Sequence, residues 1–316
     1  MAPPDDPEGY WYKGWSPFFD PKPGRPGYGL KGRGAHQGYQ EARRAAIRAR
    51  RAENQFAVQL RRIARMIGHI VTGMATPDEP SGLQRIVAAL QDYGRLITPW
   101  ANATAERLLA DVSRRDAAGW HQLGQSINRA LREEIAGADI GPHVQRLIAE
   151  TTDFITSLPY DAAERVQRLA MEAVTGGKRW EDIAQELYAS GEVSLSRANL
   201  IARTETSRAA TTLQQVRAEH VGSEGYIWRT ARDRDVRVSH KALEGSFHKW
   251  SEPPVATDPG QREVRAHPGA IYNCRCFPEI VLPGMDITAR LGPQARNPAY
   301  LEALRAAGYT EGAAFE

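Results

Sequence analysis

The chain has 316 residues, of which 41% are hydrophobic and 25% are charged, as in a globular protein with a buried core. Two cysteines in this length exclude a disulfide-rich scaffold and favour a reducing compartment, and no apolar run approaches the roughly 18 residues of a membrane span. The formal net charge is +3, but it is unevenly distributed: residues 1–75 hold 13 Lys and Arg against 6 Asp and Glu, so this part carries +7 and the rest −4. A basic region of this kind indicates an anionic partner, either nucleic acid or an acidic protein.

Residues 1–39 are rich in proline and glycine, with aromatic residues between them, and show the period of neither a helix nor a strand. A segment of this composition cannot bury a core of its own. We therefore expect an extended arm that lies on a partner, or alternatively on the rest of the chain, with aromatic side chains as anchors. The anchors that we single out are Trp11, Trp15, Phe18 and Phe19.

A long helix is predicted from Gln40 to about Met74, because apolar residues recur at spacings of four and three. These residues are Phe56, Leu60, Ile63, Ile67, Ile70 and Met74. The stretch 43–65 also holds eight arginines and no lysine, which favours bidentate contacts to phosphates or carboxylates over a merely solvated face. The candidate contacts are Arg43, Arg44, Arg48, Arg50, Arg51, Arg61 and Arg62.

Further helical patterns continue to about residue 221, separated by proline and glycine signals. We expect helices over residues 83–93, 99–136, 141–157, 161–175, 178–189 and 194–221. The breaks include Leu158-Pro159 and Ser190-Gly191, and a weaker one is expected near Gly119. The chain up to this point is therefore predicted to be helical.

Strand patterns appear only after the helices, at 226–230, 247–250 and 271–282. The fold class that follows is mainly α, an elongated helical body with a small C-terminal α+β module and an extended N-terminal arm. We expect four segments: the arm over 1–39, a helical region with the basic helix over 40–159, helices and then the α+β module over 160–282, and a tail over 283–316 with a short helix.

The two cysteines form Cys274-Arg275-Cys276. On a strand, residues i and i+2 point to one face, so both thiols could bind one zinc ion, with His240 and His267 as further ligands. The alternative is that the thiols are small buried apolar groups. We expect no cofactor unless this zinc site exists.

A polar cluster is predicted around the module. Asp233, Arg237 and His240 lie close together in the sequence, and Arg203 or Glu205 is expected to reach from the preceding helix and hold the module in place. No nucleophile elbow, P-loop or zinc-protease motif accompanies them, so we assign no catalytic residue. The alternative is a metal-dependent nuclease or hydrolase that uses His240 and Asp233.

The ordered combination of these motifs resembles the phage Mu protein F-like minor head proteins, a phage head morphogenesis family, over about residues 160–282. The residues that carry the resemblance are Ile-Ala-Arg-Thr-Glu-Thr at 201–206, Trp228, Asp233, Arg237, His240, Leu243 with Gly245, and Asn-Cys-Arg-Cys at 273–276. Tyr272 and Val238 depart from the pattern, since proline is usual there.

The resemblance implies a minor capsid protein, synthesised in the host cytoplasm and carried in few copies in the virion, inside the capsid. The expected partners are the portal protein or the major capsid protein, with packaged double-stranded DNA as a further candidate, and no membrane contact is expected. Family members act in head morphogenesis and in the fate of packaged or ejected DNA. A freely acting DNA-binding protein is a further alternative.

Overall fold

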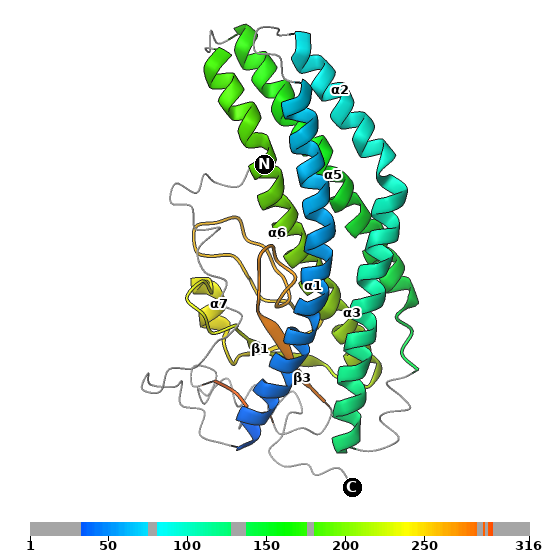
Figure 1. The fold of residues 1–316 in the computed structure, drawn as a ribbon. Coiled ribbons are helices and arrows are strands. Elements are labelled where there is room, and N and C mark those ends of the chain that lie inside the picture. Colours follow the sequence, from blue (N-terminus) through cyan, green and yellow to red (C-terminus); the bar gives the residue numbers. More distant parts are fainter. Residues whose placement is uncertain are drawn as a thin grey trace.

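The computed structural model describes residues 33–74, 81–127, 137–175, 180–282, 287 and 290–292. The expected mainly α fold is confirmed: long helices lie side by side, and a small sheet and its loops lie against one end of them (Figure 1). The arm was predicted over residues 1–39, but residues 33–39 already belong to the first long helix. Residues 1–32, with the four aromatic anchors, and the predicted short helix of the tail lie outside the described residues.

In the described part of the chain, the helical body contains five long helices. They are α1 (Arg33–Met74), α2 (Ser81–Leu96), α3 (Thr98–Ile127), α5 (Gly141–Thr175) and α6 (Trp180–His220). Helix α1 packs mainly along α6, while α2 and α3 pack on α5. None of the described helices combines the length and the apolar character needed to cross a bilayer.

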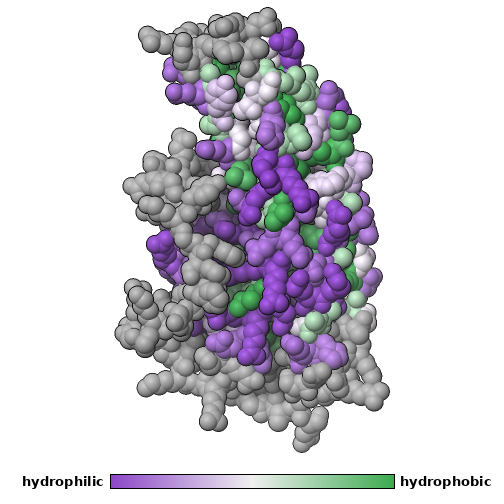
Figure 2. Space-filling view, in the orientation of Figure 1, coloured by the Kyte–Doolittle hydropathy of each residue, from purple (hydrophilic) through white to green (hydrophobic). Residues whose placement is uncertain are grey.

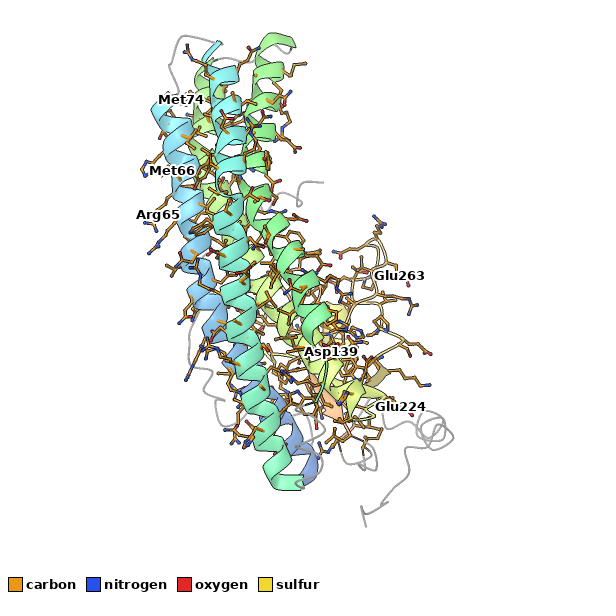
Figure 3. The ribbon with its side chains drawn as sticks, turned by 90° about the vertical axis from the view of Figure 1, so that its right-hand side faces the viewer. Arg65, Met66, Met74, Asp139, Glu224 and Glu263 are labelled. Atoms are coloured by element: carbon orange, nitrogen blue, oxygen red, sulfur yellow. The ribbon has the colours of Figure 1, made fainter. Side chains whose placement is uncertain are left out.

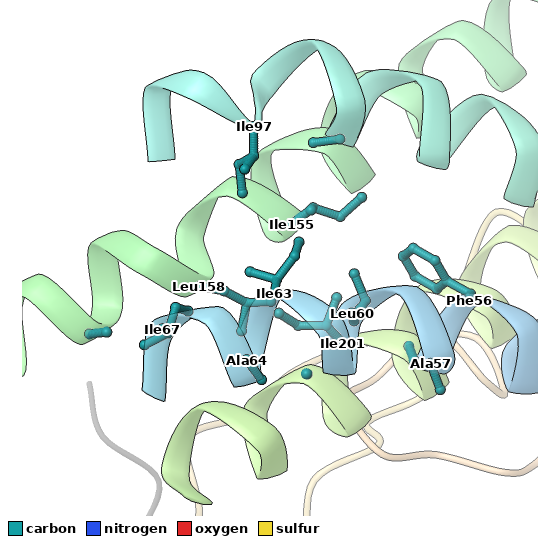
Figure 4. Packing of buried hydrophobic residues seen from close by; sticks show 14 of the residues in the cluster. Phe56, Ala57, Leu60, Ile63, Ala64, Ile67, Ile97, Ile155, Leu158 and Ile201 are labelled. Carbon is teal, nitrogen blue, oxygen red and sulfur yellow. The ribbon is translucent and has the colours of Figure 1, made fainter. Parts of the chain in front are cut away.

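The predicted apolar row on α1 is buried for most of its length. Its buried members are Phe56, Leu60, Ile63 and Ile67. They pack against residues of α5 and α6 (Figure 4). The prediction was wrong in the last turn, where Met74 is 38% exposed and Val71 is buried, because a row with a strict seven-residue repeat drifts around a straight helix of 3.6 residues per turn.

Three expected helix breaks do not exist. Pro159 lies inside the continuous helix α5, although proline removes one backbone hydrogen bond; its neighbour Leu158 is buried in the core, and this packing holds the helix together. Gly191 lies inside α6 because it faces Gly68 of α1: a Cβ on Gly191 would lie 3.4 Å from the Gly68 Cα. The two glycines therefore allow the two helices to approach closely instead of ending them. Helix α3 likewise continues through Gly119.

The α+β module (residues 225–282) contains a three-stranded antiparallel sheet in the order β2-β1-β3. Its elements are β1 (Gly225–Arg229), α7 (Val238–Leu243), β2 (Phe247–Lys249) and β3 (Phe277–Val281). The third strand was expected to begin at residue 271 but begins at Phe277. Asn273 has a φ of +55°, a left-handed conformation that interrupts an extended strand. The two cysteines thus lie in a loop rather than in a strand.

Candidate functional site

The loop with the two cysteines (residues 268–276, the cysteine loop) is fastened to helix α6. Arg203 Nη1 donates to Asn273 Oδ1 at 2.6 Å, and the Asn273 backbone N–H donates to Thr204 Oγ1 at 3.0 Å. Arg203 Nε also lies 3.5 Å from Glu53 Oε1 on α1. Both hydrogen bonds act on the residue that has the left-handed backbone, so they hold the turn that positions the cysteines.

Glu205, the other residue expected to reach the module, points elsewhere. Its carboxylate accepts hydrogen bonds from Arg208 and from Thr151 Oγ1 of α5, the latter at 3.5 Å. Burial raises the pKa of Glu205, and the Arg208 guanidinium acts in the opposite direction. Arg208 also binds Glu150. Glu205 therefore joins α6 to α5 within the helical body.

Asp233, the acidic residue expected to act together with His240, binds an arginine instead, and so does the neighbouring Asp235. Arg275 Nη2 lies 2.9 Å from Asp233 Oδ1 and 3.2 Å from Asp235 Oδ2. Arg237 lies over the Tyr272 ring, 4.6 Å from its centroid, and donates to the Tyr272 carbonyl oxygen at 3.0 Å. These contacts lie on the outer side of the cysteine loop. The carboxylates of Asp233 and Asp235 bind Arg275 and do not orient the His240 ring.

Beneath this surface, His240 and the two cysteines form a buried cluster. The His240 Nδ1 atom lies 3.6 Å from Cys274 Sγ and 3.4 Å from Cys276 Sγ, and all three atoms lie within 4.8 Å of one another. His267, which the sequence suggested as a further ligand, is not in this group. Its Nδ1 atom lies 3.0 Å from the Tyr226 hydroxyl, and its ring packs against Tyr226 and Trp250.

The two thiols of the cluster differ in acidity. The hydrogen bond from Cys276, together with that from the Gly269 N–H, lowers the pKa of Cys274 well below its usual range, although burial opposes the shift. The same bond to Cys274 and burial raise the pKa of Cys276. Cys274 is therefore the more acidic of the two thiols.

A buried ionic network, which the sequence did not indicate as a site, supports the sheet next to this cluster. The fully buried Arg229 on β1 donates from Nε to Glu279 Oε2 on β3 at 2.6 Å, and Arg290 Nη1 lies 3.1 Å from Glu279 Oε1. Glu244 accepts from both the backbone N–H and the hydroxyl of Thr230 at 2.6 Å. The sequence held one signal for this network: each of two otherwise apolar strands contains one charged residue.

The arginines of α1 differ in exposure. Arg44, Arg51, Arg61 and Arg62 are exposed, whereas Arg43, Arg48 and Arg50 are partly buried. Arg48 Nη1 donates to Gln122 Oε1 of α3 at 3.2 Å. Arg44 and Arg48 line a cleft of about 360 Å³ with Trp120 and Glu279, between α1, α3 and β3. Only part of the predicted basic row therefore faces solvent freely.

Comparison with known proteins agrees with the resemblance drawn from the motifs. Residues 164–278 match the family described as Phage Mu protein F like protein. An uncharacterized protein of Haemophilus influenzae is 31% identical over 166 residues, 52% of this chain and 34% of that protein. Minor head protein GP7 of Bacillus phage SPP1 is 26% identical over 171 residues, 49% of this chain and 54% of that protein.

The chain thus spans about a third of the first relative and about half of the second. No solved structure matches it.

Proposed function

We propose that this chain, whose residues 164–278 belong to the phage Mu protein F-like family, is a minor head protein of a tailed phage. The observation that carries the proposal is this match, together with the 26% identity to a minor head protein of phage SPP1. The role is structural: the protein takes part in head assembly inside the capsid, where it binds the portal protein or the inner face of the shell.

Quantitative mass spectrometry of purified virions and of DNA-free proheads tests this role. A low and constant ratio to the portal protein in both particles is the expected result, because a protein bound at the portal is incorporated before the DNA enters. Absence from both particles would refute the role in the head and favour a metal-dependent nuclease or hydrolase, or a freely acting DNA-binding protein.

The arm is proposed to attach the protein to its partner. Its aromatic residues suit anchoring, and helix α1, which follows it, is fixed on the module: the Tyr39 ring lies 5.7 Å from the Phe277 ring, and Arg232 lies 3.8 Å from the Tyr39 centroid. Deletion of residues 1–32 keeps these contacts. The shortened chain is expected to fold but to be lost from heads, and its normal incorporation would contradict the anchor role.

Helix α1 offers a surface for an anionic partner. Arg44, Arg51, Arg62 and Arg65 are exposed, and their spacings of 7, 11 and 3 place them near one face of the helix. Figure 2 shows hydrophilic side chains along α1, and Figure 3 shows Arg65 pointing away from the other helices. We propose that this row, the basic face, binds packaged DNA or an acidic protein surface.

A matched pair of triple variants tests the basic face. Replacement of Arg51, Arg62 and Arg65 by glutamine is expected to weaken DNA binding and to lower the slope of log K against log salt by up to about 0.9 per lost phosphate contact. The control replaces three exposed arginines elsewhere, Arg95, Arg114 and Arg146, with the same change in net charge. Equal effects in both variants would exclude a specific DNA contact of this face.

A further inference from the structure

The distances in the buried cysteine–histidine cluster are those of a tetrahedral zinc site. Zn–S bonds of about 2.3 Å and Zn–N bonds of about 2.0–2.1 Å at a tetrahedral angle place the sulfur and nitrogen atoms about 3.5–3.6 Å apart. The His240 Nδ1 atom lies 3.4 Å and 3.6 Å from the two Sγ atoms. We propose that His240, Cys274 and Cys276 bind one zinc ion.

The hydrogen bonds of His240 leave the correct nitrogen free for a metal. Its Nε2 lies 2.8 Å from the Ala256 carbonyl oxygen, and a carbonyl only accepts hydrogen bonds, so Nε2 carries the proton. The lone pair of the neutral ring is therefore on Nδ1, which faces the thiols. A ligating histidine whose second nitrogen donates to a carbonyl is the usual arrangement in zinc sites.

Donor groups around the sulfur atoms suit thiolates. The backbone N–H groups of Gly269 and Cys276 donate to Cys274 Sγ at 3.3 and 3.4 Å. The buried Trp228 Nε1–H has no hydrogen-bond acceptor among the described residues. This N–H is directed at the Cys276 sulfur. A zinc-bound Cys276 thiolate would supply the acceptor that this N–H lacks.

Zinc also accounts for the charge of the cluster. Two buried thiolates without a cation would be costly, whereas one Zn²⁺ with two thiolates and a neutral imidazole is uncharged. A disulfide is the alternative state, but residues two apart in a chain form one only with strain, and both cysteines are free thiols here. The cluster is thus arranged for a cation rather than for a crosslink.

The fourth zinc position faces a cavity of about 80 Å³ next to the three ligands, lined also by Asp235, Arg237 and Asn273. A water molecule, which takes about 30 Å³ in the liquid, fits there. The ion would join α7 to the cysteine loop, which has little regular structure of its own. Small modules commonly need such a crosslink for stability, so the role inferred for the zinc is structural.

Metal analysis of the full-length protein tests the inference. The protein is purified without a histidine tag from zinc-supplemented cells, and its metal content is measured by mass spectrometry; about one zinc per chain is expected. Cys276→Ser should lose the zinc. The control His267→Gln should keep it, because His267 binds Tyr226 rather than the cluster.

A second measurement does not depend on the folding of a variant. Reduced, chelator-treated wild-type protein is reconstituted with Co²⁺, and the visible and near-ultraviolet bands of a tetrahedral cobalt thiolate are expected, together with a melting temperature that zinc raises and a chelator lowers. A wild-type protein that contains no zinc and shows no such bands after reconstitution would overturn the proposal. So would wild-type zinc content in Cys276→Ser.

Discussion

The helical body and the α+β module are stabilised by different interactions. The body has one continuous core of buried aliphatic and aromatic side chains that runs through all five helices. The module has two smaller apolar clusters, one of which includes both cysteines, and it also holds a fully buried arginine, a buried glutamate and the buried His240. An apolar core requires about the right volume, whereas each buried charge requires a particular partner. Sequence changes should therefore be tolerated very differently in the two regions.

The family match follows the same division. It covers residues 164–278, which include the end of α5, all of α6 and nearly all of the module, but not α1, α2 or α3. The polar contacts that join α6 to the cysteine loop lie inside this region, as between Arg203 and Asn273. Polar partners at fixed positions make a recognisable motif, while a row of apolar residues on a helix is common to many proteins. The recognisable part of this chain is thus the part held by specific polar contacts.

The largest effect is expected from breaking the buried network of the module. Arg229→Met leaves Glu279 buried without its 2.6 Å partner, and loss of one member of a buried ion pair costs about 3–5 kcal/mol. Urea unfolding followed by tryptophan fluorescence measures it, because Trp228 and Trp250 are both buried in the module.

Two further variants sharpen this result. Arg265→Met removes an ion pair whose two side chains are both 61% exposed, so it should change stability by at most about 1 kcal/mol. Arg229→Met combined with Glu279→Leu removes both charges and should recover part of the loss. A single Arg229→Met variant with wild-type stability would contradict the importance of the network.

A somewhat smaller effect is expected in the core of the body. Leu60 is fully buried, and Leu60→Ala should cost about 2–5 kcal/mol through lost burial and a cavity. Leu60→Met should cost less than about 1.5 kcal/mol. Arg229→Lys in the module is an equally conservative change but should cost more, because lysine lacks the planar, forked guanidinium group of arginine. Similar losses of unfolding free energy in Leu60→Met and Arg229→Lys would contradict the proposed difference between the body and the module.

Detaching the cysteine loop from α6 should have a moderate effect. Arg203→Ala removes the hydrogen bond to Asn273, and since the side chain is 27% exposed, a loss of about 1–2 kcal/mol is expected. Hydrogen exchange should increase in residues 268–276 and stay unchanged in α2. Arg197→Ala, which removes a more exposed ion pair with Asp161, is the control and should not affect the loop.

The last expected effect is a pH dependence specific to the module. Burial lowers the pKa of His248 to about 4, whereas the unfolded residue has an ordinary pKa of about 6.5. The unfolded chain therefore binds a proton that the folded protein excludes, and stability present above about pH 6.5 is lost as the pH falls towards 4. His248→Gln should flatten the curve of unfolding free energy in this window. Parallel curves for both proteins would contradict the burial effect.

Much of the fold and part of the site could be predicted from local patterns. The spacing of Phe56, Leu60, Ile63 and Ile67 indicated one long helix with one buried face, and the structure has it. The predicted breaks at Pro159 and Gly191 were wrong. Proline and glycine weaken a helix locally, but tertiary packing outweighs that cost here. Gly191 lies where two helices touch, and no local signal distinguishes such a glycine from one that ends a helix.

The sequence by itself determined that the body is helical and brought the two cysteines within two residues of each other. Only the tertiary structure decided which histidine joins them. Helix α7 carries His240 to the thiols, while the ring of His267 packs against Tyr226 and Trp250. The turn that presents the thiols depends on Arg203 and Thr204, about 70 residues earlier in the chain. The reason is physical: helix periodicity is a property of neighbouring residues, whereas a buried polar group is stabilised only by a partner that folding brings to it.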